Sequence, residues 1–555
     1  MTRRREFLQY AGLGMMTGGA ARAARLSDTD RRKIVAEARF GRKKAASGKN
    51  GVVVCAHPLA THAGIEMLKS GGNACDAACT VAVTQTVVEP HMTTITGVFS
   101  MLYYDAKTGK TTYMNGGMNV PKAGLPGYSA ADMKTGRGAG VPGWWGGFEA
   151  ALAKHGTKPK SDVMATAIGY ARDGFEVHPF LYGEMYDMLA TIGRTPEGRE
   201  IFMPHGTLLV PGQVLKQEKA ARTLERLQAE GSDYFYRGDF AKKYSEVVKK
   251  HGGVITPEDF AAYKVRWDEP ARSTYRGYDI LASPPPDNGG THIIEALNII
   301  ELMDLQKLGP PSESAETMHG MLLISNEVMS AGARQTDPNS HPVPLDLIVS
   351  KDYARTRWKL LKMSAPLATT PPAPPGSNHV TVVDASGNVA TVLHSCMALP
   401  WSNGLFVEGV SICASGGHFL RVMPKPGDRA SAYVGPNMLF KNGKPILASG
   451  SPSVSLIANI LQNTVNLLDF GIPIEDSIHR PRFGAAYPNP AQNMIEADVD
   501  EKIQQQITAK GGVALDPVSP WYYHCGSFEG IYIDPATGVR SACGDPRRAG
   551  QAEGY

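Results

Sequence analysis

The sequence lacks the features that mark disulfide-rich, nucleic-acid-binding, zinc-binding and membrane-spanning proteins. Seven cysteines in 555 residues are few and odd in number, which argues against a disulfide framework. Its 57 basic residues nearly balance 53 acidic ones, and the lack of a basic tract sets nucleic acid aside as a partner. Cys75 and Cys79 have no Cys or His partners at zinc spacing, so packing is their expected role and no metal is predicted. After the first two dozen residues, no apolar run reaches the roughly 18 residues of a membrane helix.

The first two dozen residues have the composition of an export signal. The basic stretch TRRREFLQY precedes the short apolar stretch AGLGMMTGGA and a small-residue cleavage site at Ala21–Ala23. The twin arginines before Glu6, Phe7 and Leu8 resemble the twin-arginine class of signals. We expect residues 1–23 to be removed and the mature protein to be periplasmic or secreted; a merely basic amino terminus is the alternative.

Residue patterns predict strands and helices in the first two thirds of the chain. Residues 51–89 are expected to form a strand, a helix ending at Gly71 and a second helix begun by Asn73. Residues 99–115 alternate around a turn and predict a hairpin. Helical patterns dominate residues 140–365, apart from an expected strand and proline-rich loop over 273–290.

The last third predicts more strands. NHVTVVD and NVATVLHS flank the turn 385–388 and predict an antiparallel hairpin, as do residues 529–545. Residues 444–471 predict a strand, a tight turn and a helix that is apolar around most of its circumference and therefore buried. The predicted fold is α/β, with two stacked, mainly antiparallel sheets between helical layers.

The junction PPAPPGSNHVTVVD, residues 371–384, has two interpretations. Proline has no N–H to give to a sheet, so the run before Gly376 must be a loop. One interpretation is a surface loop that enters a strand. The other is a peptide bond that is cut, which would make Ser377 a new amino terminus.

Several motifs in order resemble the γ-glutamyltransferase family of N-terminal-nucleophile hydrolases. GIEMLKSGGNACDAA, GAGVPGWWGGFEAAL and YARDGFEV are similar to its N-terminal segment, and SNHVTVVDASGNVATV to its nucleophile hairpin. GSPSVS is similar to its oxyanion loop, and GDPRRAGQAEGY to its C-terminal signature. The resemblance spans residues 51–555. It implies the αββα sandwich of that family and an amide hydrolase or acyltransferase.

The resemblance also implies self-cleavage between Gly376 and Ser377. The products would be a large subunit, residues 24–376, and a small subunit, residues 377–555, which would stay together as a heterodimer. Ser377 takes the place of the family's threonine, and both residues carry a β-hydroxyl that needs a neighbouring base. The freed α-amine, with a reference pKa of about 7.7–8.0, supplies that base, so neither a metal nor an organic cofactor is needed.

Three further positions correspond to the family's catalytic groups. Ser395 matches a hydroxyl that bonds the nucleophile, with an ordinary strand serine as the alternative. Ser453 and Val454 match a glycine pair whose backbone N–H groups bind the oxyanion. A positive φ at serine or valine is costly, so a differently shaped loop is an alternative there.

The family's charged contacts to glutamate are absent. An arginine that holds the α-carboxylate falls on Gly117, and two serines that assist it fall on Ala432 and Tyr433. An aspartate that holds the α-ammonium falls on His418, and a neighbouring glutamine on Ser415. Since a buried charge that loses its partner typically costs about 3–5 kcal/mol, we expect a small-molecule amide or peptide other than a γ-glutamyl one.

Aromatic residues offer a replacement pocket. Trp401 and the run 521–523 are expected either to line an apolar acyl site or to serve only in packing. Two other functions remain open. One is a true γ-glutamyltransferase with a rebuilt glutamate pocket. The other is a non-catalytic relative that binds without turnover, although the hydroxyl of Ser377 argues against it.

Overall fold

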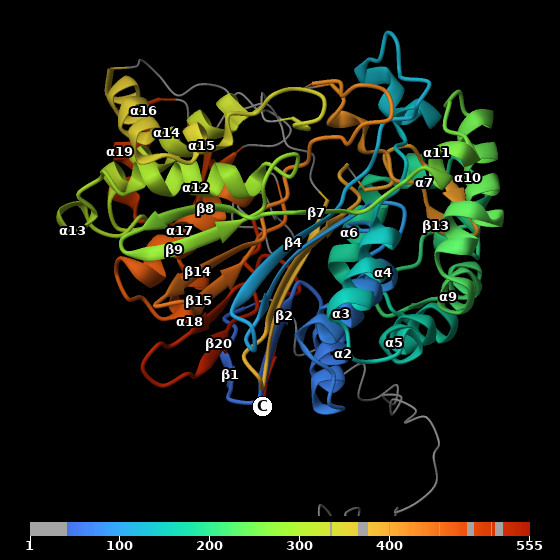
Figure 1. The fold of residues 1–555 in the computed structure, drawn as a ribbon, viewed down its shortest axis with the longest axis horizontal. Coiled ribbons are helices and arrows are strands. Elements are labelled where there is room, and N and C mark those ends of the chain that lie inside the picture. The colour runs from blue at the N-terminus through green and yellow to red at the C-terminus, as the bar shows by residue number, and fades with distance from the viewer. Residues whose placement is uncertain are drawn as a thin grey trace, which may run out of the picture.

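The protein folds as four layers, with two sheets stacked between helices (Figure 1). The computed structural model describes these residues: 41–332, 336–363, 376–398, 400–420, 422–453, 455–485, 493–511, 513–516 and 526–555. The predicted export signal, residues 1–23, and the aromatic run 521–523 therefore lie outside the described residues. In the described part of the chain, no helix has both the length and the apolarity to cross a membrane.

Each main sheet has seven strands. The first sheet runs in the order β1 (Ala46–Gly48), β20 (Arg540–Ala542), β19 (Ile531–Ile533), β15 (Lys444–Ser449), β14 (Asn437–Lys441), β9 (Tyr278–Ala282), β8 (Ala271–Tyr275). The second sheet runs in the order β21 (Gln551–Gly554), β2 (Gly51–Cys55), β10 (Asn378–Asp384), β11 (Val389–Ser395), β3 (Val98–Asp105), β4 (Lys110–Gly116), β7 (Arg266–Asp268). Their strands pair antiparallel throughout, as predicted.

Helices cover the outer faces of both sheets (Figure 1). The second sheet is covered by α2 (Pro58–Lys69), α3 (Ala74–Val88) and α4 (Trp144–His155), with α5 (Lys160–Asp173), α9 (Glu218–Glu230), α10 (Asp239–Lys250) and α11 (Pro257–Ala261) farther out. The first sheet is covered by α12 (Gly289–Ile300), α14 (Ala315–Gly332), α16 (Lys351–Met363), α17 (Leu456–Leu468), α18 (Ile474–His479) and α19 (Glu501–Thr508).

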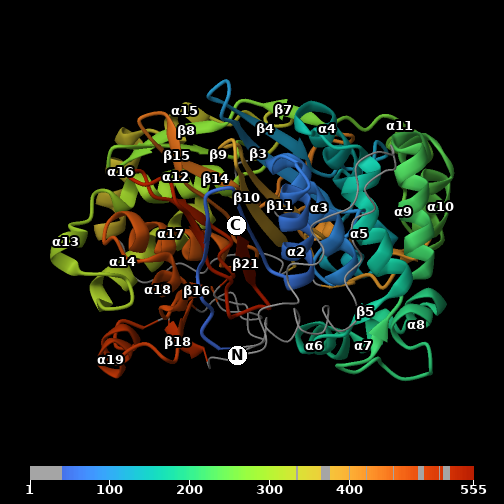
Figure 2. The same cartoon turned by 90° about the horizontal axis from the view of Figure 1, so that it is seen from below.

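Shorter elements fill the edges. The helices are α6 (Pro179–Asp187), α7 (Leu189–Ile192), α8 (Pro196–Phe202), α13 (Leu305–Leu308) and α15 (Leu345–Ile348). The strands are β5 (Phe175–Glu176), β6 (Val214–Leu215), β12 (Phe406–Val407), β13 (Val410–Ser411), β16 (Phe483–Ala485), β17 (Asn493–Glu496) and β18 (Val513–Asp516). Figure 2 shows α6, α7 and α8 together at one edge of the molecule.

The central strands are apolar on both faces because both faces are buried. In β2, Val53 packs toward the helices while Val52 and Val54 pack between the two sheets. In β10, Val380 and Val382 likewise face the helices. Side chains alternate across a strand, so a continuous apolar run marks a strand with a layer on each side.

Most predicted elements are confirmed. The strand and two helices of residues 51–89 form β2, α2 and α3, and Asn73 caps α3 in a capping box with Asp76. The hairpins β3–β4, β10–β11 and β19–β20 are all present. The helix α17 is buried along nearly its whole length.

Residues 273–290 differ from the expectation of one strand. Two strands, β8 and β9, pair there around the turn at Arg276 and Gly277, whose φ angles are +49° and +83°. Two consecutive positive φ values make the tight turn that suits a two-residue hairpin loop. Arginine is not a typical residue for this turn, and the hairpin was therefore missed.

Candidate active site

Three oxygen atoms meet at the predicted cleavage point. Ser377 Oγ lies 2.8 Å from the carbonyl oxygen of Gly376 and 2.8 Å from Ser395 Oγ. Ser395 Oγ also donates to the Gly376 carbonyl oxygen at 2.5 Å and accepts from the N–H of Met397 at 2.7 Å. Two hydroxyl groups thus surround the carbonyl of the bond between Gly376 and Ser377.

The register of the central hairpin produces this meeting. Asn378 in β10 pairs with His394 in β11, so the next residues outward, Ser377 and Ser395, lie opposite each other. Opposed residues in an antiparallel pair have Cβ atoms about 4.5–5.5 Å apart, which brings two serine hydroxyls within hydrogen-bonding reach.

Gly376 has a conformation that requires glycine. Its φ is +110°, and a Cβ atom placed on it would lie 2.4 Å from the carbonyl oxygen of Ala398 and 3.0 Å from Cys396 Sγ. Any other residue would meet both a backbone penalty and a collision. The local geometry of the junction therefore depends on the glycine.

The loop after β15 approaches the same hairpin. A Cβ atom on Gly450 would lie 2.1–2.6 Å from the ring of His379, so the loop begins in direct contact with the strand that follows Ser377. His379 is fixed by Thr391 Oγ1 at 2.7 Å, and burial lowers its pKa to about 3. Ser453 stands where the family has a glycine, and its φ is +96°. Glycine adopts such an angle readily, whereas serine adopts it at a cost. Val454 lies outside the described residues.

The side chain of Arg429, from another segment of the chain, packs directly against Gly117. A Cβ atom on Gly117 would lie 2.9 Å from Cδ of Arg429. The buried Arg429 donates through Nε to Asn119 Oδ1 at 2.7 Å, through Nη1 to the Asn115 carbonyl at 3.1 Å, and through Nη2 to the Lys264 carbonyl at 2.6 Å. All three guanidinium nitrogens are therefore engaged by the protein.

The other predicted substrate-binding positions are His418, Tyr433 and Ser415. His418 and Tyr433 are buried, with ring centroids 6.1 Å apart. Ser415 begins the short 3₁₀ turn Ser415–Gly417. One hydrophobic cluster contains chain neighbours of Gly117, His418 and Tyr433, namely Met118, Phe419, Ala432 and Val434.

A buried aspartate was missed by the sequence analysis. Asp287 Oδ2 accepts from Ser100 Oγ at 2.5 Å and from the Tyr113 hydroxyl. Burial raises the pKa of Asp287 to about 6, against the hydrogen bonds of Ser100 and Tyr113 and the charge of Arg429. Its loop, SPPPDNGG, has no periodicity, and pairing with Ala432 through a β-bridge is what brings it to the site.

Two more charged residues were missed. Arg548 donates to the carbonyl oxygen of Ser377 at 2.9 Å and to Glu89 Oε1 at 2.7 Å. Both side chains are almost fully buried. Arg548 lies in the segment GDPRRAGQAEGY, which resembles the family's C-terminal signature, but its contact with Ser377 joins residues 171 positions apart.

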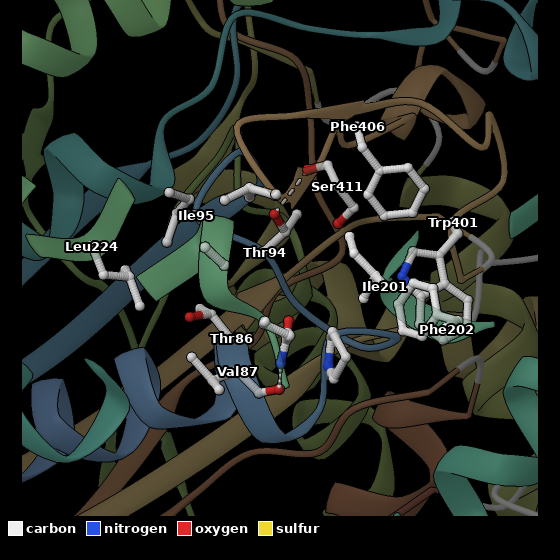
Figure 3. A pocket seen from close by; sticks show the side chains of 15 residues that line it. Thr86, Val87, Thr94, Ile95, Ile201, Phe202, Leu224, Trp401, Phe406 and Ser411 are labelled. Carbon is white, nitrogen blue, oxygen red and sulfur yellow. Dashed lines mark hydrogen bonds between the residues drawn. The ribbon is translucent and has the colours of Figure 1, made fainter. Parts of the chain in front are cut away.

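Trp401 lines a small hollow beside the segment that follows Ser395 (Figure 3). Its ring packs 4.9 Å from the ring of Phe202 and 6.1 Å from that of His91. Ile95 and Leu224 line the same hollow, together with the polar side chains of Thr86, Thr94, Gln217 and Ser411. Trp401 is thus packed against other aromatic rings, and its role in an acyl site stays a prediction.

Among the described residues, no group of three or more His, Cys, Asp or Glu side chains is placed to hold a metal ion. Cys75 and Cys79 are buried in α3, and Cys75 Sγ donates to the Ala151 carbonyl at 3.4 Å. Their packing role agrees with the prediction from spacing.

Known proteins resemble the chain over nearly its whole length. A family profile described as Gamma-glutamyltranspeptidase matches residues 60–555. The glutathione hydrolase proenzyme of Bacillus subtilis (strain 168) is 29% identical over 561 residues, covering 92% of each chain. The acylase ACY 1 proenzyme of Pseudomonas sp. (strain SE83) is 31% identical over 507 residues, covering 84% of this chain and 88% of that protein.

Solved structures also resemble this chain. The crystal structure of a cephalosporin acylase from Bacillus halodurans superposes with a TM-score of 0.81 and 26% identity, covering 93% of this chain and 97% of the other. These likenesses confirm the predicted fold and the predicted class of enzyme, an amide hydrolase or acyltransferase. The chain belongs to the gamma-glutamyltranspeptidase family.

Proposed function

We propose that this protein is a self-processing amide hydrolase or acyltransferase whose nucleophile is Ser377. The observation that carries the proposal is the placement of two hydroxyls, Ser377 Oγ and Ser395 Oγ, within 2.8 Å and 2.5 Å of the Gly376 carbonyl oxygen. The names of the Bacillus and Pseudomonas relatives, which are both called proenzymes, support processing here as well.

Self-cleavage begins when Ser377 Oγ attacks the Gly376 carbonyl carbon. The new C–O bond replaces the C–N bond of the peptide, and the proton of the hydroxyl ends on the freed nitrogen. Water then hydrolyses the ester, which leaves a carboxylate on Gly376 and a free α-amine on Ser377. The products, residues 24–376 and 377–555, form the active heterodimer.

Catalysis repeats the same chemistry on a substrate amide. The neutral α-amine of Ser377 takes the proton of its own hydroxyl, and Oγ attacks the substrate carbonyl. Backbone N–H groups of Ser453 and Val454 stabilise the oxyanion, and the φ of +96° at Ser453 supports the glycine-like loop that this role needs. The amine gives its proton to the leaving nitrogen, and water or another amine then releases the acyl group.

The acyl group is proposed to be other than γ-glutamyl. Arg429 fills the space above Gly117, and its nitrogens are already bound to Asn115, Asn119 and Lys264. At the position of the ammonium partner, His418 is buried beside Tyr433. A zwitterionic acyl group would therefore be desolvated without partners.

The similarity to the acylases supports this choice of substrate class. The second candidate is a true γ-glutamyltransferase or glutathione hydrolase. The similarity to the Bacillus subtilis glutathione hydrolase proenzyme favours it, provided that Arg429 moves to bind a carboxylate.

Export through the signal in residues 1–23 belongs to the same proposal, because the basic start, short apolar stretch and Ala21–Ala23 site suit it. The mature protein would then act in the periplasm or outside the cell. N-terminal sequencing of the large product should begin near Ala24; an intact Met1 in mature material contradicts export.

Denaturing electrophoresis of the purified protein tests the mechanism. We expect bands of roughly 38 and 19 kDa, from 353 and 179 residues, in the wild type and in Ser377→Thr. Ser377→Ala should stay uncut and inactive. An uncut wild type that hydrolyses amides contradicts the proposal. Matched chromogenic anilides then separate the two candidate functions. Rapid turnover of the γ-glutamyl anilide, with no turnover of an apolar acyl anilide, would favour a true γ-glutamyltransferase or glutathione hydrolase.

A further inference from the structure

Arg548 holds the backbone at the start of β10. Its Nη1 donates to the carbonyl oxygen of Ser377 at 2.9 Å, and its Nη2 donates to Asn378 Oδ1 at 2.8 Å. The side chain is 2% exposed, and its guanidinium lies 5.4 Å from the centroid of the Phe180 ring. A residue 171 positions away in sequence thus fixes the first peptide group of the strand.

Glu89, the C-cap residue of α3, completes a buried ion pair with this arginine. Its Oε1 accepts from Arg548 Nη2 at 2.7 Å, and its Oε2 accepts from Gln85 Nε2 at 2.9 Å. Gln85 Oε1 lies 2.9 Å from Nε2 of His394, the residue before the end of β11. A continuous hydrogen-bonded chain therefore joins the carbonyl of Ser377 to the strand that carries its hydroxyl partner.

Cleavage before Ser377 removes one of the two covalent restraints on that residue. A residue at a chain end is poorly ordered unless other contacts hold it. The bond from Arg548 is made to the carbonyl group on the side that stays attached, so cleavage does not remove it. We propose that Arg548 and Glu89 form a positioning pair that orients the terminal Ser377 and sets the proton affinity of its α-amine. The inference rests on the proposed function of Ser377.

Arg548 and Glu89 form the buried charged pair that is hydrogen-bonded to the Ser377 carbonyl. The guanidinium disfavours a proton on the amine, and the carboxylate favours one. Glu529 faces the same arginine, and burial raises its pKa well above the usual range, which favours its neutral form. Asp545 is engaged by Arg482 and Arg547.

The nearby imidazoles are neutral as well. Burial lowers the pKa of each of five histidines: His57, His91, His178, His379 and His394. At pH 7, removing Arg548 or Glu89 therefore changes the potential at the amine in opposite directions.

Steady-state kinetics of the matured protein against pH, with an amide that the wild type hydrolyses, test the pair. In Arg548→Gln we expect kcat to fall about a hundredfold with little change in KM, because the nucleophile is misplaced. The acid limb of kcat/KM should move up by about one pH unit in Arg548→Gln and down by about one in Glu89→Gln. Arg548→Lys keeps the charge, so its acid limb should stay in place while kcat falls less.

Arg276→Gln is the matched control, because it removes a guanidinium beside Asp469, which is 3% exposed, at the far end of the first sheet. It should lower the melting temperature without moving the acid limb. If Glu89→Gln does not fold, the neutral double variant Glu89→Gln/Arg548→Gln replaces it and should combine a low kcat with a nearly unshifted limb.

The outcomes separate the two proposals. An active Ser377→Ala would overturn the proposed function. With Ser377→Ala inactive, shifts of the same sign in both single variants, or wild-type kcat and pH profiles in them, would overturn only the positioning role.

Discussion

At the scale of residues, several side chains and backbone angles near the junction are costly in isolation and are held by their surroundings. Ser453 has φ +96° and Gly376 has φ +110°, and the proposed mechanism puts each beside a reacting carbonyl. An unfavourable conformation of a non-glycine residue costs about 1–3 kcal/mol and persists only where the fold over-determines it. The contact of Gly450 with His379 provides such a constraint for the loop of Ser453.

Another residue with a costly environment lies far from this junction, in α12. Glu295 is 1% exposed, and its Oε1 has no hydrogen-bond partner among the described residues. Burial raises the pKa of Glu295 to about 8, against the charge of Arg357. The folded protein therefore binds a proton here that the unfolded chain has released above about pH 4.5.

Stability should fall as the pH rises from about 4.5 to 8, because the unfolded chain releases a proton that the folded protein retains. Glu295→Gln removes this loss, so we expect it to be stabilised by roughly 3–5 kcal/mol relative to the wild type at pH 9 and by little at pH 4.5. Denaturant unfolding at both pH values measures the difference. Glu246→Gln, on the exposed face of α10, is the control; an equal effect of Glu295→Gln at both pH values contradicts the assignment.

At the scale of elements, the β10–β11 hairpin positions the chemistry and the loop after β15 docks on it. His379 in β10 is held by Thr391 in β11, and its ring leaves no room for a side chain on Gly450. This close approach aligns the two elements without any charged contact. The register of one hairpin and one glycine therefore set the distance between Ser377 and the loop of Ser453.

Gly450→Ala tests this docking. Because the added methyl meets a rigid, hydrogen-bonded ring, we expect a loss of about 1–3 kcal/mol in stability. The displaced loop should lower kcat about a hundredfold. Thermal unfolding and turnover are the measurements. Gly169→Ala in α5, where a methyl meets nothing within 4 Å, should raise stability slightly. Wild-type values for Gly450→Ala would contradict the contact.

At the scale of the whole molecule, the two products of the proposed cleavage are interleaved. In the second sheet, β2 of the large product lies between β21 and β10 of the small one, and β11 pairs with β3 of the large product. In the first sheet, β1, β9 and β8 of the large product flank four strands of the small one. Neither product has a complete sheet by itself.

We therefore expect the cut protein to migrate as one particle of about 57 kDa in size-exclusion chromatography without denaturant. The two chains should separate only when both unfold, in a single transition in guanidinium chloride, because each supplies strands to both sheets. Uncut Ser377→Ala serves as the size reference. Separation of folded large and small chains in buffer would contradict the interleaving.

How much could be predicted differs between elements. The hairpin of residues 378–395 follows from its alternation and turn, and its register already places Ser377 opposite Ser395. The β8–β9 hairpin was missed, because Arg276 is an unusual residue for its turn. Asp287 was missed for a related reason, since a proline-rich loop has no periodic signal.

The sequence by itself determined the layered sheets and indicated the Gly376–Ser377 junction, because local periodicity and ordered motifs encode them. Only the tertiary structure decided that Arg429 covers Gly117 and that Arg548 and Glu89 brace Ser377. These contacts join segments hundreds of residues apart. They depend on strand order and on the packing of buried charges, and neither of these produces a periodic pattern in the sequence.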